Sequence, residues 1–167
     1  MRISRLTPIG RMFAFLAFVG VLLFPVSSAF AAGAGAVTMT QTFHNATQSF
    51  PGTDLCTSAT GTLTLTYNGV AHTTFLTSGV GAGTGWATFT STGDVVFTPD
   101  NPANPTYTGH FTNWDGQSFN LKNFTATSIL VVHATGSDGS TLMFHEVAHF
   151  SVSASGITLS FDKPTCG

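Results

Sequence analysis

Apolar and hydroxyl-bearing residues alternate along much of this chain, and this period-two pattern constrains the fold more than any other feature. In Thr62–Tyr67, leucine and tyrosine occupy every second position and threonine occupies the positions between. Successive side chains of an extended strand point to opposite faces, so this alternation predicts half-buried strands. No segment after residue 32 shows a helical period. We therefore expect an all-β fold.

Turn sequences separate the predicted strands. Asn-Gly and Asp-Gly pairs favour two-residue hairpin turns, because both positions need positive φ. The predicted turns lie at Asn68-Gly69, Asp115-Gly116, Asp138-Gly139 and Ser155-Gly156, and longer connections lie at Ser78–Gly85 and Pro99–Pro105. About eight strands in meander order follow from this spacing. The pattern predicts a single antiparallel up-and-down β-barrel, with a two-sheet β-sandwich as the alternative.

The N-terminus has the pattern of a cleaved secretion signal. Arg2, Arg5 and Arg11 precede or enter an apolar run, Met12–Val26, and small residues at Ala29-Phe30-Ala31 offer a peptidase site. The apolar run is short for a membrane span, so none is expected after cleavage. We predict a signal peptide over residues 1–32 and a secreted, extracellular domain over residues 33–167.

The net charge of the predicted mature chain restricts its partners. Cleavage removes all three arginines and leaves Lys122 and Lys163 against seven acidic residues, a net charge of −5. Nucleic acids and anionic membranes are bound through basic patches, which so few cations cannot form. A small molecule or a glycan is the expected kind of ligand.

Two cysteines, Cys56 and Cys166, both lie in the predicted secreted part. An even pair in an exported chain predicts a disulfide. It would close a loop of about 110 residues and contribute roughly 4–5 kcal/mol in the chain-entropy model. A redox or metal pair would need a CxxC spacing, which is absent from the sequence.

The pentapeptide HEVAH, residues 145–149, has opposite meanings on a helix and on a strand. On a helix, His145 and His149 would hold zinc with Glu146 as general base. The stretch alternates, however, and a turn at Ser155-Gly156 aligns its apolar row with that of residues 157–161. On a strand the two histidines are about 13 Å apart, too far to share a metal. We expect a strand, with the zinc hydrolase or peptidase as the alternative.

Glu146 is the one glutamate of the chain, and the pattern places it in an apolar row. A buried carboxylate needs a partner or a proton. The predicted turn registers place His72, His110 and His133 on the same inward face, each on a different hairpin. We therefore predict that these four residues converge in the barrel lumen as a ligand site. A metal site formed by the three imidazoles, or an acid–base pair in a barrel enzyme, is an alternative use of the same cluster. The alternative places the histidines at a rim and Glu146 at a bulge or strand end.

Three segments resemble a group of small secreted proteins from actinobacteria and related Gram-positive soil bacteria. These segments are TYTGHFTNW (106–114), TGSDGSTLMFHEVAHFSVSASG (135–156) and SFDKPTC (160–166). The order SDGS…HxxxH…SFDxxxC is the specific part of the resemblance. It implies export and the disulfide, and it implies no activity.

These observations favour a binding role over catalysis and call for no cofactor outside the zinc alternative. Small exported barrels often hold ligands, which is an argument from fold analogy. The predicted function is a binding module for a small molecule or a surface glycan. Trp86 and Trp114 are expected in the core, where the tryptophans of a barrel more often lie, with an aromatic platform for sugars as the alternative. A surface or matrix protein without a pocket is the further alternative.

Overall fold

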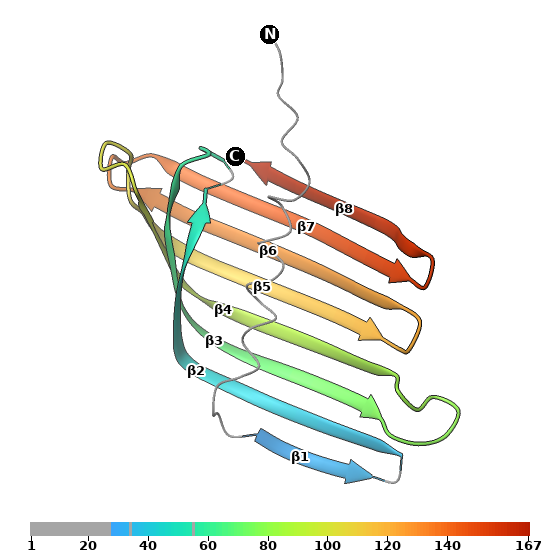
Figure 1. The fold of residues 1–167 in the computed structure, drawn as a ribbon. Helices are drawn as coiled ribbons and strands as arrows, with labels where there is room; N and C mark the ends of the chain where they lie inside the picture. Colours follow the sequence, from blue (N-terminus) through green and yellow to red (C-terminus); the bar gives the residue numbers. More distant parts are fainter. Residues whose placement is uncertain (1–27, 34, 55) are drawn as a thin grey trace.

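The computed structural model describes residues 28–33, 35–54 and 56–167, which form strands and connecting loops without a helix. The strands are β1 (Ser28–Gly33), β2 (Ala36–Thr53), β3 (Thr60–Leu76), β4 (Gly85–Pro99), β5 (Tyr107–Phe119), β6 (Phe124–Gly136), β7 (Thr141–Ser153) and β8 (Gly156–Cys166). They make one eight-stranded antiparallel sheet in sequence order (Figure 1). The predicted all-β meander is thus confirmed. Residues 1–27 of the predicted signal lie outside the described residues, and residues 28–32 form most of β1.

The sheet is open. β1 and β8 are the two ends of the strand order, and among the described residues neither pairs with the other. The predicted closure into a barrel is therefore wrong, and a single sheet that bends over itself is closer to the sandwich alternative. Pro164 in β8 explains part of this, because it has no N–H to donate to a further strand. No helix of the described part is long and apolar enough to cross a membrane.

A β-bulge produces the bend. The pairing of β2 with β3 shifts register between Phe43 and Ala46, and Asn45 in the bulge has a φ of 48°. Bulges bend the strand that carries them and increase its twist. In Figure 1 the last part of β2 and the first part of β3 turn steeply away from the rest of the sheet.

The bend encloses the core on one face, which we call the inner face. Its first cluster of buried side chains comes from β2 to β5 and consists of Phe43, Leu65, Tyr67, Ala71, Val95 and Phe111. A second cluster joins Phe97, Tyr107 and Ala134, and Ala59 from the β2–β3 loop packs against it. The loop therefore reaches strands that are distant in the sheet order. The opposite face, which we call the outer face, carries the alternating threonines.

The predicted disulfide is present and fastens this bend. Cys56 lies in the β2–β3 loop, Cys166 ends β8, and their Cα atoms are 5.7 Å apart. The bond therefore joins a loop near one end of the sheet order to the strand at the other end. A disulfide of this kind suggests an oxidising, extracellular-type environment.

Two of the four predicted turns are absent, and the other two lie at chain reversals that differ from the prediction in length or position. The β6–β7 loop is longer than two residues, and the β7–β8 turn is at Ala154-Ser155, one residue earlier than predicted. Asp138-Gly139 and Ser155-Gly156 lie at chain reversals, where Gly139 and Gly156 have φ values of 82° and 111°. Asn68-Gly69 and Asp115-Gly116 instead lie inside β3 and β5, paired with a strand on each side. A dipeptide that favours a hairpin turn stays extended when the strands on both sides of it continue past its position.

Candidate functional site

The four residues predicted to converge in a lumen lie on opposite faces of the sheet. Glu146 in β7 lies on the inner face, in the row of the buried side chains Phe144 and Ala148. His72, His110 and His133 are exposed on the outer face. The structure does not bring the histidines to the glutamate, and the predicted convergence is wrong.

A one-residue error in register explains the position of His133. The β6–β7 loop is longer than the predicted two-residue turn, so that Thr135 pairs with Thr141. His133 is consequently opposite Met143 instead of Phe144. Because side chains alternate between faces, a shift of one residue moves the histidine to the other face. His72 and His110 lie outward because the turns expected at Asn68-Gly69, before His72, and at Asp115-Gly116, after His110, are absent.

The HEVAH segment is extended, as predicted, and its geometry does not fit a zinc site. His145 and His149 lie on the outer face of β7, and Glu146 lies on the inner face. His149 accepts or donates a 2.7 Å hydrogen bond with Thr127 and stacks on Phe161 at 5.7 Å between ring centroids. Within the described ranges, no three His, Cys, Asp or Glu side chains cluster closely enough to hold a metal ion. The zinc alternative is therefore wrong for this geometry.

Glu146 forms a hydrogen bond with Asp162 of β8. Ala148 pairs with Asp162, which brings the Asp162 carboxyl diagonally beside that of Glu146, and the two carboxyls share a hydrogen bond. Such a bond requires a proton. Burial first, and then the hydrogen bond and negative charge of Asp162, raise the pKa of Glu146 from 4.5 to about 7. The sequence pattern missed Asp162 because a register shift at Ser151/Val152 precedes it.

We expect the free energy of unfolding to decrease as the pH rises from about 4.5 to 7. In this range the folded state holds the Glu146 proton, which the unfolded chain has released at its lower pKa. Glu146→Gln replaces the carboxyl by a neutral donor. After a discount for partial exposure, it should stabilise the protein by about 1 kcal/mol at pH 8 and flatten this slope. Urea unfolding at several pH values measures both effects.

Asp162→Asn provides the matched control for this prediction. It removes the negative charge that opposes ionisation of Glu146, and so lowers the pKa of Glu146 in the folded state. The free energy of unfolding should therefore decrease less between pH 4.5 and 7 than in the wild type. If both variants keep the wild-type slope between pH 4.5 and 7, the shared proton is not responsible for it.

The other polar groups on the inner face largely pair with each other. Asn113 donates a hydrogen bond of 2.5 Å to Asp115, which also bonds to Ser128. Burial raises the pKa of Asp115, and these two hydrogen bonds oppose the rise. Together with the two apolar clusters, these pairs leave the inner face with few groups directed at a ligand.

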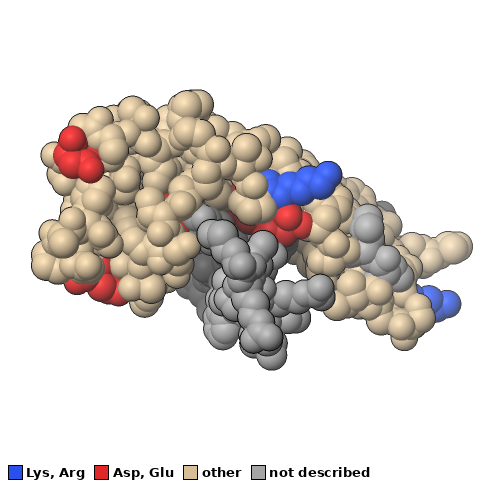
Figure 2. All heavy atoms as spheres, turned by 90° about the horizontal axis from the view of Figure 1, so that it is seen from above, with Lys and Arg blue, Asp and Glu red and all other residues tan. Residues whose placement is uncertain are grey.

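The outer face carries many threonine and serine hydroxyl groups. Threonine and serine side chains on neighbouring strands pair across it, and the hydrogen-bonded pairs include Thr38–Thr74 (3.1 Å), Thr47–Thr66 (3.3 Å), Ser49–Thr64 (2.8 Å) and Ser118–Thr125 (2.7 Å). Cross-strand pairs of this kind stabilise a sheet and keep its surface regular. Charged residues make up 7 % of the chain, and the side of the molecule seen in Figure 2 is mostly uncharged.

Both tryptophans lie on this outer face. Trp86 is 43 % exposed and Trp114 is 39 % exposed, so the expectation that they lie in the core is wrong. Trp86 in β4 pairs with Ser118 of β5, and Thr90 of β4 pairs with Trp114. The two tryptophans therefore lie on neighbouring strands, offset by four residues or about 13 Å along the strand direction.

Gly116 leaves room for the Trp114 ring above the strand. A Cβ atom at this position would collide with the six-membered ring of the indole, so the ring covers the glycine. Gly116 pairs with Thr88, which lies between Thr90 and Trp86 on β4. The ring is thus displaced from the Trp114 backbone toward Trp86. The glycine in the Asp115-Gly116 pair serves this packing and does not form a turn.

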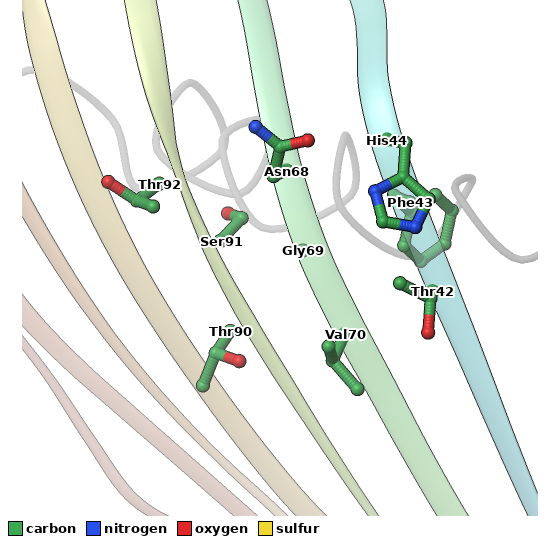
Figure 3. Close-up of a pocket in the computed structure, with 9 residues that line it drawn as sticks. All are labelled: Thr42, Phe43, His44, Asn68, Gly69, Val70, Thr90, Ser91 and Thr92. Atoms are coloured by element: carbon green, nitrogen blue, oxygen red, sulfur yellow. The ribbon is translucent and has the colours of Figure 1, made fainter.

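An open groove of about 560 Å³ lies beside Trp114 on the same face (Figure 3). One side is formed by Thr42, Val70 and Thr90, and the other by His44, Asn68 and Thr92. Each side takes one residue from β2, β3 and β4, so the groove crosses the strands between two rows of side chains. Because Thr90 pairs with Trp114, the first row leads directly to the indole. The predicted alternation placed these threonines outward but did not indicate a groove.

Comparisons with protein-family models, with curated proteins and with solved structures gave no match to this chain. Function must therefore be argued from the chemistry of the two faces. On the inner face most polar groups pair with each other, although the buried hydroxyl of Ser91 has no hydrogen-bond partner among the described residues. The outer face presents two aromatic rings, hydroxyls, an amide and imidazoles to solvent.

Proposed function

We propose that this protein is a secreted glycan-binding module and that Trp86, Trp114 and the adjoining groove form its binding surface. The observation that supports the proposal is the exposure of both tryptophans on one hydroxyl-rich face, at 43 % and 39 %. Exposing two indoles leaves a large apolar area in water, and the exposed side chain of Ile129, which pairs with Trp114 across β5 and β6, adds to it. A contiguous apolar area of this kind is typical of a binding site.

The flat indole of Trp114 suits the apolar face of a sugar ring. A pyranose presents C–H groups on its faces and hydroxyls around its edge. An aromatic ring that lies along the sheet can cover the C–H groups while neighbouring side chains bond to the hydroxyls. The offset of about 13 Å between Trp86 and Trp114 along the strands matches an oligosaccharide better than a single sugar.

The side chains around the tryptophans supply the hydrogen bonds. The Thr90 hydroxyl in the groove can donate and accept, as sugar hydroxyls do. Thr92 donates its hydroxyl hydrogen to the carbonyl of Phe111 and can accept, and Asn68 accepts a bond from the N–H of Asn45 and can donate through its amide nitrogen. His44 adds an imidazole at the end of the groove on β2. The groove contains no Asp, Glu, Lys or Arg among its lining residues, so the proposed ligand is a neutral polysaccharide.

Alanine substitution of the tryptophans should abolish most of the binding. We expect wild-type protein to be retarded in affinity gels that contain at least one neutral polymer among hydroxyethyl cellulose, xylan, laminarin and glycol chitin. Trp114→Ala should weaken binding to the retarding polymer by about 30-fold, or about 2 kcal/mol, as for a buried aromatic at the centre of an interface. Calorimetry with oligosaccharides of that polymer measures the change.

Met143→Ala is the matched control, because Met143 is an exposed apolar side chain of the same face, 50 % exposed and remote from both tryptophans in the pairing register. It should bind as wild type does. The proposal fails if no polymer retards the wild-type protein, or if Trp86→Ala and Trp114→Ala bind as tightly as Met143→Ala.

A further inference from the structure

Among the described residues, the short strand β1 is the one strand that pairs with the outer edge of β2. β1 pairs with the first part of β2, from Ser28 opposite Gln41 to Gly33 opposite Ala36. The signal cleavage expected after Ala31 or Ala32 would remove nearly all of β1. In the processed chain, the backbone N–H and C=O groups of β2 that face β1 would lose their partners.

The edge that cleavage would expose has none of the usual protection against strand addition. Residues 36–43 of β2, Ala-Val-Thr-Met-Thr-Gln-Thr-Phe, contain no proline and no charged side chain. The opposite edge, β8, carries Asp162, Lys163 and Pro164. Charged residues and proline are common devices that prevent edge strands from pairing with other chains. The two edges of this sheet thus differ in the property that decides whether a further strand can be added.

We propose that removal of β1 allows two copies of the mature chain to join through their β2 strands. β1 already shows that this edge accepts an antiparallel strand in regular register over six residue pairs. A second copy of β2 offers a strand of the same uncharged composition, so no like charges meet. The bulge between Phe43 and Ala46 ends the regular part of the edge and confines the contact to residues 36–43.

The symmetry of this contact has a consequence for binding. Two identical antiparallel strands are related by a two-fold axis perpendicular to the sheet, which is a closed, isologous arrangement. Such an axis leaves both outer faces on the same side of the joined sheet. Two pairs of Trp86 and Trp114 would then face one polysaccharide surface, which would raise avidity. This consequence rests on the proposed function, whereas the dimer does not.

The test is the oligomeric state of full-length chain after secretion from a bacterial host. Intact mass should show an N-terminus after Ala31 or Ala32. Light scattering at micromolar concentration should give the mass of two chains. Thr40→Lys places a lysine from each copy near the two-fold axis and should yield monomers. Thr165→Lys, the matched change on the β8 edge, should leave the dimer intact.

Near-ultraviolet circular dichroism should show that the Thr40→Lys monomer is folded. A wild-type monomer, a dimer that persists in Thr40→Lys, or a mature chain that retains residues 28–33 would overturn the proposal. None of these measurements involves a glycan, so failure of the dimer and failure of glycan binding are distinguished.

Discussion

Replacing both Cys56 and Cys166 by alanine is expected to lower the free energy of unfolding by about 4–5 kcal/mol. The disulfide joins residues separated by 110 positions, and in the chain-entropy model a loop of this length restricts the unfolded chain by about that amount. This is a large share of the 5–15 kcal/mol that is typical of a single domain. Urea unfolding of the double variant against wild type measures the loss.

The structure gives this disulfide a second role in the folded state. The sheet is open, so backbone pairing does not hold the β2–β3 loop against the far strands. Cys56 links that loop to the end of β8, and Ala59 in the same loop packs against the cluster of Phe97, Tyr107 and Ala134. Wild-type protein treated with reductant should unfold at the same urea concentration as the double variant. A loss below about 1 kcal/mol would show that the apolar contacts of the loop suffice.

The class of the fold was predictable because alternation is a local property. The threonines between the apolar residues of β3, and the extended HEVAH segment of β7, follow from the period of two alone. The disulfide followed from the number of cysteines and the expected export. None of these predictions needed the register between strands.

The predicted site failed where register was required. A longer β6–β7 loop moved His133 to the outer face, and a shift before Leu159 changed which β8 residues lie beside Glu146. A single residue decides the face of a side chain, but loop length and bulges are set by tertiary packing. The inward position of Glu146 was predictable from its own strand, whereas its partner Asp162 was not.

The glycines at positions 69 and 116 illustrate a further limit of sequence patterns. Each follows Asn or Asp in a pair that favours a hairpin turn in isolation. In the structure, strands on both sides of β3 and β5 continue past these pairs and keep them extended. At position 116 the missing side chain instead accommodates the Trp114 indole. That use of glycine depends on a contact between side chains, which the local sequence does not specify.

Phe111→Ala is expected to lower the free energy of unfolding by about 3–5 kcal/mol, the usual cost of removing a phenylalanine from a packed core. Phe111 is 2 % exposed and lies in the middle of the inner face, between Gly93 of β4 and Val132 of β6. Its ring meets that of Tyr67 edge to face at 6.4 Å. Truncation leaves a cavity that the surrounding strands cannot close, because each is held by pairing on both sides. Urea unfolding monitored by far-ultraviolet circular dichroism measures the loss.

Phe161→Ala is the control for this variant, because Phe161 is 37 % exposed on the outer face and should cost less than about 1 kcal/mol. Equal losses in the two variants would contradict a core on the inner face. β5 carries Phe111 inward and Trp114 outward, so the comparison also separates folding from binding. At a temperature where Phe111→Ala remains folded, it should retain glycan affinity close to that of wild type. Trp114→Ala should do the reverse and lose affinity while keeping most of its stability, because the two side chains belong to opposite faces of one strand.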